Sequence, residues 1–422
     1  MSENKKLIPK RRFKEFQNTD AWEQRELGKF VSLITKGTTP RDKSGSGSIN
    51  FIKVENISDG IISPVSKISE DEHEGYLQRS KLKENDILIS IAGTLGRTGV
   101  VDKTILPANT NQALAIIRGY DFDKDFLLTS LNGKAVKDFI RRNPTIGAQP
   151  NLSLEQVGKF LIYTPKKEEQ IQIGVFFKNL DQTIAFQQRK LEKMKSMKSA
   201  YLSEMFPAAG ERKPKRRFPG FTDDWKQCKL EDMCSLITKQ TGFDYSATIK
   251  PSLINKKNDS TYSFIQNKDF SGFNINLNTD FYIPVKIAEK FPRILLDQPS
   301  LLVTISGKIG NLGLYNDVKK AFIGGAVGIC KLNDLKEGEF ILYELTSEFG
   351  QRQFRKSTKT SSHANITVEM IKDIDIIIPK NHIEHNKIFK FFKQLDTTIA
   401  FQQQKLEKLQ NIKKAYLNEM FI

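Results

Sequence analysis

The sequence predicts a mixed α/β (α+β) fold with an internal pseudo-two-fold repeat, in which two long antiparallel coiled-coil helices separate two variable domains. Two observations predict the repeat. Residues 180–206 and 395–421 are identical at 19 of 27 positions without a gap, and the basic segment 9–13 (PKRRF) recurs as 214–218. Because chance does not produce matches of this length, the chain contains an internal duplication. Equivalent halves on one chain can be arranged like the subunits of a homodimer.

Further landmarks fix the extent of each half. The chain's two tryptophans, Trp22 and Trp225, are at equivalent positions, and 91–99 (IAGTLGRTG) matches 305–313 (ISGKIGNLG). Between these landmarks the halves diverge freely, which is typical of one scaffold carrying two different recognition surfaces. We expect a first variable domain (1–164), a first conserved helix with a linker (165–212), a second variable domain (213–378) and a second conserved helix (379–422).

The two conserved helices are predicted from a heptad pattern. In 173–205 and 388–420 the seam positions alternate in steps of four and three residues, and neither block contains proline. This spacing favours coiled-coil packing. If a two-fold axis relates the halves, the helices pack antiparallel, with Gln187 beside Lys413 and Lys198 beside Gln402. These side chains would then form either a buried polar layer or a group that reaches solvent at the edge of the seam.

The variable domains are predicted to mix short strands with one helical stretch late in each domain, at 126–142 and 340–356. The β-rich runs are 51–54, 87–91, 113–117, 301–305 and 374–378. The segments 93–99 and 307–313 follow strands and have glycine at every third position. Such a loop either lets the backbone approach a phosphate or forms a hairpin turn. Neither copy ends in the GK[ST] sequence of a nucleotide-binding loop.

Charge and composition narrow the class of partner. The 422 residues include 38% hydrophobic residues, enough to build cores, and carry a formal net charge of +17 at pH 7. A basic excess of this size favours a polyanionic partner. The three cysteines form no CxxC motif, and no apolar run approaches the length of a membrane span. We expect a cytoplasmic protein that has no membrane association and binds a polyanionic partner.

Polar loops at equivalent positions of the two halves are the candidates for contacting DNA, because bases are read by Arg, Lys, Asn, Gln, Ser and Thr side chains. Each residue alone is more often a solvated loop residue, but the recurrence favours the segments as a group. The candidates are Lys36, Thr38, Thr39, Arg41, Arg97, Gln149 and Asn151 in the first half, and Lys239, Gln240, Lys308, Asn311, Lys359, Ser362, His363 and Asn365 in the second.

No catalytic motif was found in the sequence. Pro-Pro does not occur, so the Asn-Pro-Pro or Asp-Pro-Pro signature of amino-methyltransferases is missing, and no Pro-Asp begins the common metal-nuclease pattern. His382 and His385 have ligand-like spacing but no nearby third ligand, so we expect a solvated helix face rather than a metal site. The sequence indicates a binding protein with no catalytic residues, cofactor or metal of its own.

This arrangement resembles the specificity subunit of type I restriction–modification enzymes. The residues that carry the resemblance are 216–221 (RRFPGF) with Trp225, 86–90 (DILIS), the glycine segment 93–99 and 165–170 (PKKEEQ). The resemblance covers essentially the whole chain. Two departures affect domain edges: Lys14-Glu15 stands where the second copy has Pro219-Gly220, and 381–385 (NHIEH) replaces the Glu-Gln pair at the start of the second helix.

The resemblance implies two target recognition domains that each read one half of an asymmetric split DNA sequence. It also implies partners: two methyltransferase (modification) subunits and two restriction/translocase subunits, which would carry out adenine N6 methylation and cleavage. S-adenosylmethionine, ATP and Mg²⁺ would belong to those partners. The alternative is a stand-alone two-headed transcriptional regulator, which would need no partner subunit.

Overall fold

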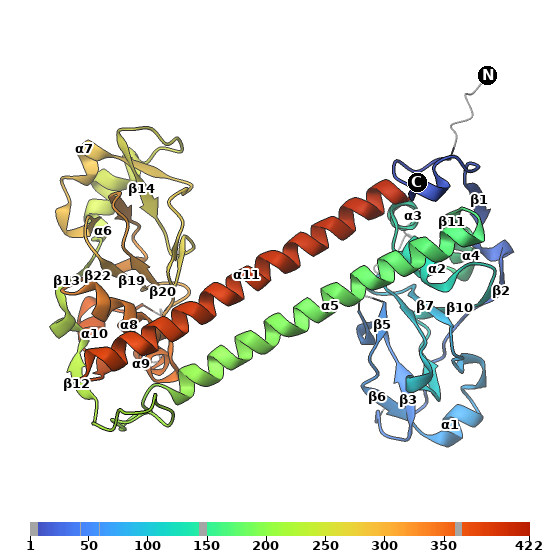
Figure 1. The fold of residues 1–422 in the computed structure, drawn as a ribbon, viewed down its shortest axis with the longest axis horizontal. Coiled ribbons are helices and arrows are strands. Elements are labelled where there is room, and N and C mark those ends of the chain that lie inside the picture. Colours follow the sequence, from blue (N-terminus) through green and yellow to red (C-terminus); the bar gives the residue numbers. More distant parts are fainter. Residues whose placement is uncertain (1–6, 43, 59, 143–149, 359–364) are drawn as a thin grey trace. The chain divides into compact units, whose positions relative to one another are not determined.

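The computed structural model describes residues 7–422 except 43, 59, 143–149 and 359–364. The chain folds as two compact units (Figure 1). Unit 1 comprises Met1–Arg189 with Gln403–Ile422, and unit 2 comprises Lys190–Gln402. Both long helices cross this division, so each unit contains a stretch of each helix.

The centre of unit 1 is a four-stranded antiparallel sheet. Its strand order is β2 (Val31–Lys36), β10 (Leu114–Tyr120), β7 (Ile87–Ser90) and β8 (Thr98–Val100). A second sheet has the order β6 (Ser66–Ile68), β3 (Ile49–Ile52) and β9 (Ala108–Thr110), with β3 and β9 parallel. Two smaller sheets pair β1 (Glu23–Glu26) with β11 (Leu161–Thr164), and β4 (Ile57–Ser58) with β5 (Ile61–Ile62). The short helices are α1 (Glu70–Glu74) and α4 (Leu154–Gly158).

The central sheet is buried on both faces, as the apolar run in β7 predicts. Ile87 and Ile89 pack in the core shared with the helices, whereas Leu88 lies in a separate core formed with the second sheet and the β4–β5 pair. This follows from the period of two along a strand. Within unit 1, Figure 1 accordingly shows α2, α3 and α4 at one end, β7 and β10 in the middle, and β3, β6 and α1 at the other end.

Unit 2 repeats this topology with one more strand, β18, in its second sheet. Its central sheet has the order β13 (Cys234–Lys239), β22 (Val327–Leu332), β19 (Ser300–Thr304) and β20 (Leu312–Tyr315). A second sheet has the order β17 (Tyr282–Pro284), β14 (Thr261–Ile265), β21 (Ala321–Ile323) and β18 (Leu295–Leu296), in which β14 and β21 are parallel. Smaller pairs join β12 (Lys226–Lys229) to β23 (Asp375–Ile378) and β15 (Phe270–Ser271) to β16 (Asn274–Ile275). The short helices are α6 (Gly242–Asp244), α7 (Val285–Ala288) and α10 (Val368–Lys372).

The helical stretch expected late in each domain is two helices, which corrects the prediction of one. Unit 1 has α2 (Lys124–Leu131) and α3 (Lys134–Arg142), and unit 2 has α8 (Leu335–Thr346) and α9 (Glu348–Thr358). Gly133 interrupts the first pair, where an added Cβ would lie 2.9 Å from the carbonyl oxygen of Ser130. Ser347 interrupts the second pair because its backbone is extended (φ −64°, ψ 167°).

The long helices are α5 (Lys167–Glu204, 38 residues) and α11 (His382–Met420, 39 residues). Within unit 1 the first part of α5 packs antiparallel to the last part of α11: the rings of Phe176 and Tyr416 are 5.1 Å apart, and further along α5, Asp181 lies by Lys413. In unit 2 the rings of Tyr201 and Phe391 are 5.0 Å apart, again with antiparallel segments.

The polar partners along this seam differ from the expected ones. Lys413 Nζ lies 2.5 Å from a carboxylate oxygen of Asp181 rather than beside Gln187, and Lys198 Nζ lies 2.5 Å from Asp396 rather than beside Gln402. A lysine gains more from a carboxylate than from an amide, because the hydrogen bond is charge-assisted. Both glutamines are buried, which rules out the solvent-edge alternative for them.

Each unit has one aromatic cluster that joins its variable domain to the long helices. In unit 1, Trp22 packs edge-on against Phe126 and Phe421, and Phe421 also contacts Phe177. The equivalent residues of unit 2 make the same cluster: Trp225, Phe340, Phe206 and Phe392. The repeated tryptophan and the Met-Phe helix ends in the sequence are therefore explained by packing. In the part of the chain that the structure describes, no helix is both long and apolar enough to cross a bilayer.

Candidate nucleic-acid interface

The end of β2 and the loop that follows it carry four of the candidate residues. At Gly37 the loop passes so close to the backbone of Thr110 that an added Cβ would lie 2.1 Å from the Thr110 carbonyl oxygen. Only glycine fits at this position. On either side of Gly37, Lys36, Thr39 and Arg41 are exposed and Thr38 is half-buried. The guanidinium of Arg41 lies over the ring of Tyr76, 4.3 Å from its centroid. Such a stack holds a cation in place while its donors stay available.

The equivalent loop of unit 2 is used differently. Lys239, at the end of β13, is exposed, but Gln240 is buried and its Nε2 donates to the carbonyl oxygen of Ile323 over 3.4 Å. Gln240 therefore packs inside the fold instead of facing outward. The two units thus present unlike side chains at equivalent places.

The glycine segments are hairpin loops, as one of the two interpretations predicts, and the approach of a phosphate to them stays a prediction. The first connects antiparallel strands β7 and β8, with positive φ at Gly93 and Gly96, and the second connects β19 and β20, with positive φ at Gly307 and Gly310. Arg97 and Lys308 are exposed on these loops. Positive φ at glycine is what a tight turn requires.

The fold brings each glycine loop next to another candidate segment. Ala92 forms an antiparallel bridge with Asn151, and Ser306 forms the same bridge with Asn365. Both asparagines are exposed. Asn311, in contrast, is used within the fold, because its Nδ2 donates to the carbonyl oxygens of Asn267 and Phe270. Four candidates, Gln149, Lys359, Ser362 and His363, lie outside the described residues.

The duplicated basic motif has a structural role that was not predicted from the sequence. Arg12 Nε donates to Glu169 at 2.8 Å with both side chains buried, and Arg217 pairs with Glu384 through two hydrogen bonds of 2.6 and 2.7 Å. The neighbouring Arg11 pairs with Glu419 at the end of α11. The signal was present in the sequence: Glu169 and Glu384 are equivalent in the two helix starts.

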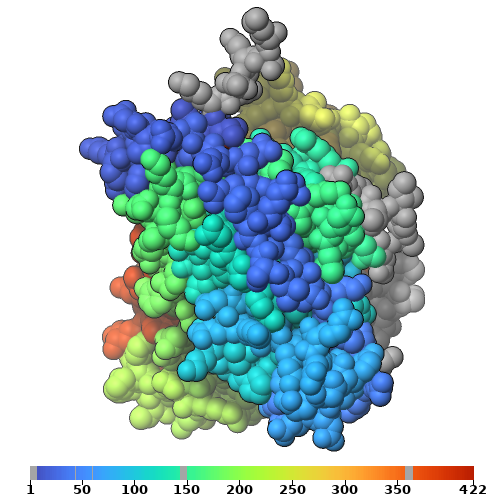
Figure 2. All heavy atoms as spheres, turned by 90° about the vertical axis from the view of Figure 1, so that its right-hand side faces the viewer, coloured from blue at the N-terminus to red at the C-terminus, as the bar shows by residue number. Residues whose placement is uncertain are grey.

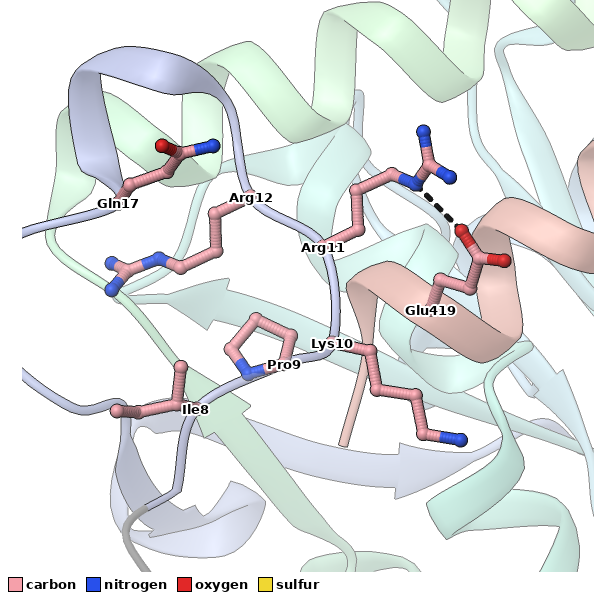
Figure 3. A pocket seen from close by; sticks show the side chains of 7 residues that line it. All are labelled: Ile8, Pro9, Lys10, Arg11, Arg12, Gln17 and Glu419. Carbon is pink, nitrogen blue, oxygen red and sulfur yellow. Dashed lines mark hydrogen bonds and ion pairs between the residues drawn. The ribbon is translucent and has the colours of Figure 1, made fainter.

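A polar cavity of about 550 Å³ surrounds the first copy of this motif (Figure 3). Figure 3 shows Lys10, Arg11, Arg12 and Gln17 around it, with Arg11 turned toward Glu419. Two of its three cations, Arg11 and Arg12, are already paired with carboxylates at the end of α11 and the start of α5. The cavity is therefore explained by the packing of the basic motif against the ends of the long helices. The face of unit 1 in Figure 2 shows this blue N-terminal segment beside the green start of α5.

The prediction that His382 and His385 lie on a solvated helix face is correct for His382 and wrong for His385. His382 is exposed, but His385 is buried with its ring 4.6 Å from that of Phe340, and burial lowers the pKa of His385 to about 4. It is a neutral core residue at physiological pH. Among the described residues, no three His, Cys, Asp or Glu side chains are grouped closely enough to hold a metal ion.

The two units have similar folds, and each presents polar loops at the equivalent edge of its own central sheet. Because the side chains on these loops differ, the protein has two comparable but non-identical candidate binding surfaces. Residues 19–196 and 222–411 both match the family model described as the type I restriction modification DNA specificity domain. The chain belongs to this family.

Individual relatives agree with this assignment. The specificity subunit of the type I restriction enzyme EcoBI from Escherichia coli is 31% identical over 131 residues, which is 30% of this chain. This match spans only 27% of the length of that curated relative. The crystal structure of the S subunit of a type I restriction–modification system from M. genitalium matches with a TM-score of 0.61 and 14% identity, over 99% of both chains.

A chain from a structural study of complex assembly and conformational transition in the type I R-M system matches with a TM-score of 0.54 and 16% identity. The match covers 95% of this chain and 97% of that one. At these identities the likeness to the two solved structures shows the fold.

Replacing Lys36 or Arg41 with alanine is expected to weaken DNA binding several-fold. If the side chain contacts a phosphate, binding to all sequences falls and the slope of log K against log salt decreases by about 1. If it contacts a base, specificity relaxes at one position by about 1–3 kcal/mol. Lys29→Ala is the matched control, because Lys29 lies just before the other end of β2. This variant should change neither the affinity for DNA nor the sequence specificity. Unchanged affinity, salt slope and target preference in both variants would remove this loop from the interface.

Proposed function

We propose that this chain is the DNA specificity subunit of a type I restriction–modification complex, which reads an asymmetric split sequence in double-stranded DNA. One observation carries the proposal: both halves match one DNA specificity family, while their equivalent loops present different side chains. A shared scaffold with different loops suits two unlike half-sites, because base-edge contacts determine which sequence is read.

The chemistry in this proposal belongs to partners. Two modification subunits would methylate adenine at N6 and two restriction/translocase subunits would cleave the DNA, with S-adenosylmethionine, ATP and Mg²⁺ bound by those subunits. This chain would be a non-catalytic, cytoplasmic component that holds no cofactor. The lack of a methyltransferase or nuclease motif in the sequence supports this division of labour.

Exposed apolar side chains on the long helices support docking of such partners. Phe186 on α5 and Phe401 on α11 are equivalent in the repeat, and they are 60% and 61% exposed. In unit 1, Phe186 shares a helix face with the exposed Ile171 and Val175, since four and eleven residues are close to whole turns. In unit 2, Ile383 lies five turns before Phe401. Exposed aromatic side chains of this kind are typical anchors of protein interfaces.

The proposal is tested by mapping methylated adenines across the genome of the host with and without this gene. We expect deletion to remove methylation at one asymmetric, interrupted motif. Exchange of residues 20–164 for the corresponding domain of another family member should change one half of the motif and leave the other intact. Methylation that persists after deletion, or a swap that changes both halves, would contradict the proposal.

A further inference from the structure

Each unit has a pocket where its variable domain meets the long helices. The pocket of unit 1 has a volume of about 430 Å³, and that of unit 2 about 380 Å³. The residues that line the pocket of unit 1 include Gly96, Arg97, Thr129, Lys137, Asp181 and Lys413. Those of unit 2 include Gly310, Lys308, Tyr343, Gln351, Asp396 and Lys198.

The two pockets are the same site occurring twice. The residues from the glycine loops and from the helices α2, α3, α8 and α9 correspond at a constant separation of 214 positions, as in Gly96 and Gly310. The residues from the long helices correspond at 215 positions, with the two helices exchanging roles: Asp181 corresponds to Asp396, and Lys413 to Lys198. The duplication has therefore preserved a complete pocket in each unit.

The glycine loop forms one wall of each pocket. Gly96 has φ +78°, and a Cβ there would lie 3.0 Å from Ile140 on α3. Gly310 has φ +79°, and a Cβ there would lie 3.3 Å from Phe354 on α9. Glycine at these positions lets the loop lie against the helix, so the repeated glycine pattern in the sequence serves the shape of this pocket.

Both pockets have an excess of positive charge. On the long helices, the Lys413–Asp181 and Lys198–Asp396 pairs are neutral as pairs. The further cations are Arg97 and Lys137 in unit 1 and Lys308 in unit 2. Within the described residues, neither Lys137 nor Lys308 has an ion-pair partner.

The positive charge is kept although different positions carry it. Arg97 corresponds to Asn311 and Lys137 to Gln351, so unit 2 lacks both cations of unit 1 and carries Lys308 instead. Both pockets are positively charged, although the charged residues are at different positions in the two units. The positive charge of the pocket is therefore the shared feature, rather than any single side chain. The occupant is therefore an anionic group that both units meet, whereas the base-reading loops differ between units.

We propose that each pocket receives an acidic surface segment of a modification subunit, one copy per unit; this inference rests on the proposed function. Two features favour a protein segment over a DNA phosphate: the pockets are concave, and their walls include apolar side chains such as Leu128 and Leu342. A peptide can place a carboxylate on the lysine that has no ion-pair partner and apolar side chains against these walls, whereas a phosphate has no apolar part to bury there.

The test uses the full chain co-expressed with the modification subunit of its own host. The variants are Lys137→Glu in unit 1, Lys308→Glu in unit 2 and the double variant. Native mass spectrometry and two-site titration report how many copies bind and how tightly. We expect each single variant to weaken binding of one copy at least tenfold and the double variant to weaken both. Lys134→Glu and Lys320→Glu, exposed and outside the pockets, should bind two copies like the wild type.

The outcomes separate the alternatives. If Lys137→Glu keeps two copies while DNA affinity and the salt slope fall for all sequences, the pocket holds a phosphate and the inference is overturned. Unchanged copy number and affinity in the double variant also overturn it. Should a glutamate variant fail to fold, Lys137→Gln replaces it, because Gln351 already occupies the equivalent place in unit 2; an unweakened complex then contradicts the inference. If the wild-type chain binds no modification subunit, the proposed function fails instead.

Discussion

Replacing Arg217 with alanine is expected to lower the free energy of unfolding by about 3–5 kcal/mol, because it leaves the carboxylate of Glu384 buried without its cation. The two side chains are 13% and 1% exposed and are joined by two hydrogen bonds, and this partner raises the pKa of the Arg217 guanidinium. Urea unfolding of the full chain, followed by circular dichroism, measures the loss. Arg12→Ala should behave similarly in unit 1, where Arg12 pairs with the buried Glu169.

The adjacent arginine is a matched control. Arg216 pairs with Glu204, but both side chains are partly exposed, at 56% and 37%. Exposed ion pairs contribute less than about 1 kcal/mol, so Arg216→Ala should change stability little. The double variant Arg217→Met with Glu384→Leu should recover much of the loss, because no unpaired charge remains. Equal effects of Arg216→Ala and Arg217→Ala would show that burial of the pair does not determine its importance.

Replacing Glu344 with glutamine is expected to stabilise unit 2 at neutral and alkaline pH. Glu344 lies on α8 and is fully buried; its Oε1 accepts the N–H of Ile377 at 2.6 Å. Among the described residues Oε2 has no partner. Burial raises the pKa of this carboxyl group well above its usual range, and the Ile377 hydrogen bond only partly opposes the shift. Glutamine has the shape of the protonated acid without its ionisation.

The direction of the pH dependence follows from this raised pKa. The protonated form is favoured in the folded state, so its stabilisation is complete below the unfolded pKa, near 4.3. It is lost as pH rises toward the folded pKa, by about 1.4 kcal/mol for each pH unit. Thermal melts between pH 5 and 8 should therefore show a steeper decline in the wild type than in Glu344→Gln. The exposed Glu231→Gln is the control, and parallel profiles for Glu344→Gln and the wild type would contradict the burial argument.

Most of the fold could be predicted from local pattern. The runs 87–91 and 301–305 correspond to the central strands β7 and β19. The heptad blocks lie in α5 and α11, except for Met205, which follows the last residue of α5. The break between α2 and α3 was missed because an isolated glycine in a helical pattern is often tolerated. The partners of Lys198 and Lys413 were missed because the heptad register alone does not show how far a lysine side chain reaches.

The candidate site was predicted only as segments. Recurrence of sequence identified the loops after β2 and β13 and the glycine hairpins. It could not show that Gln240 is buried or that Asn311 binds the backbone of the segment from Asn267 to Phe270. Those outcomes depend on contacts between residues far apart in the chain. The departure at the start of the second helix proved informative: Glu384 retains the carboxylate of Glu169, while His385 takes the place of Gln170 in the core.

Unit 1 is built from two segments that are far apart in the chain, and this affects the order in which the units can fold during synthesis. Its aromatic cluster needs Phe421, and the N–H of Arg11 donates to the carbonyl oxygen of Glu419 at 2.9 Å. A ribosome delivers these residues only after all of unit 2, which is continuous in the chain. The half that is translated first is thus completed last. A chain released before Phe421 would leave Trp22 and Phe126 uncovered in unit 1, and exposed apolar surface of this kind favours aggregation and binding by chaperones.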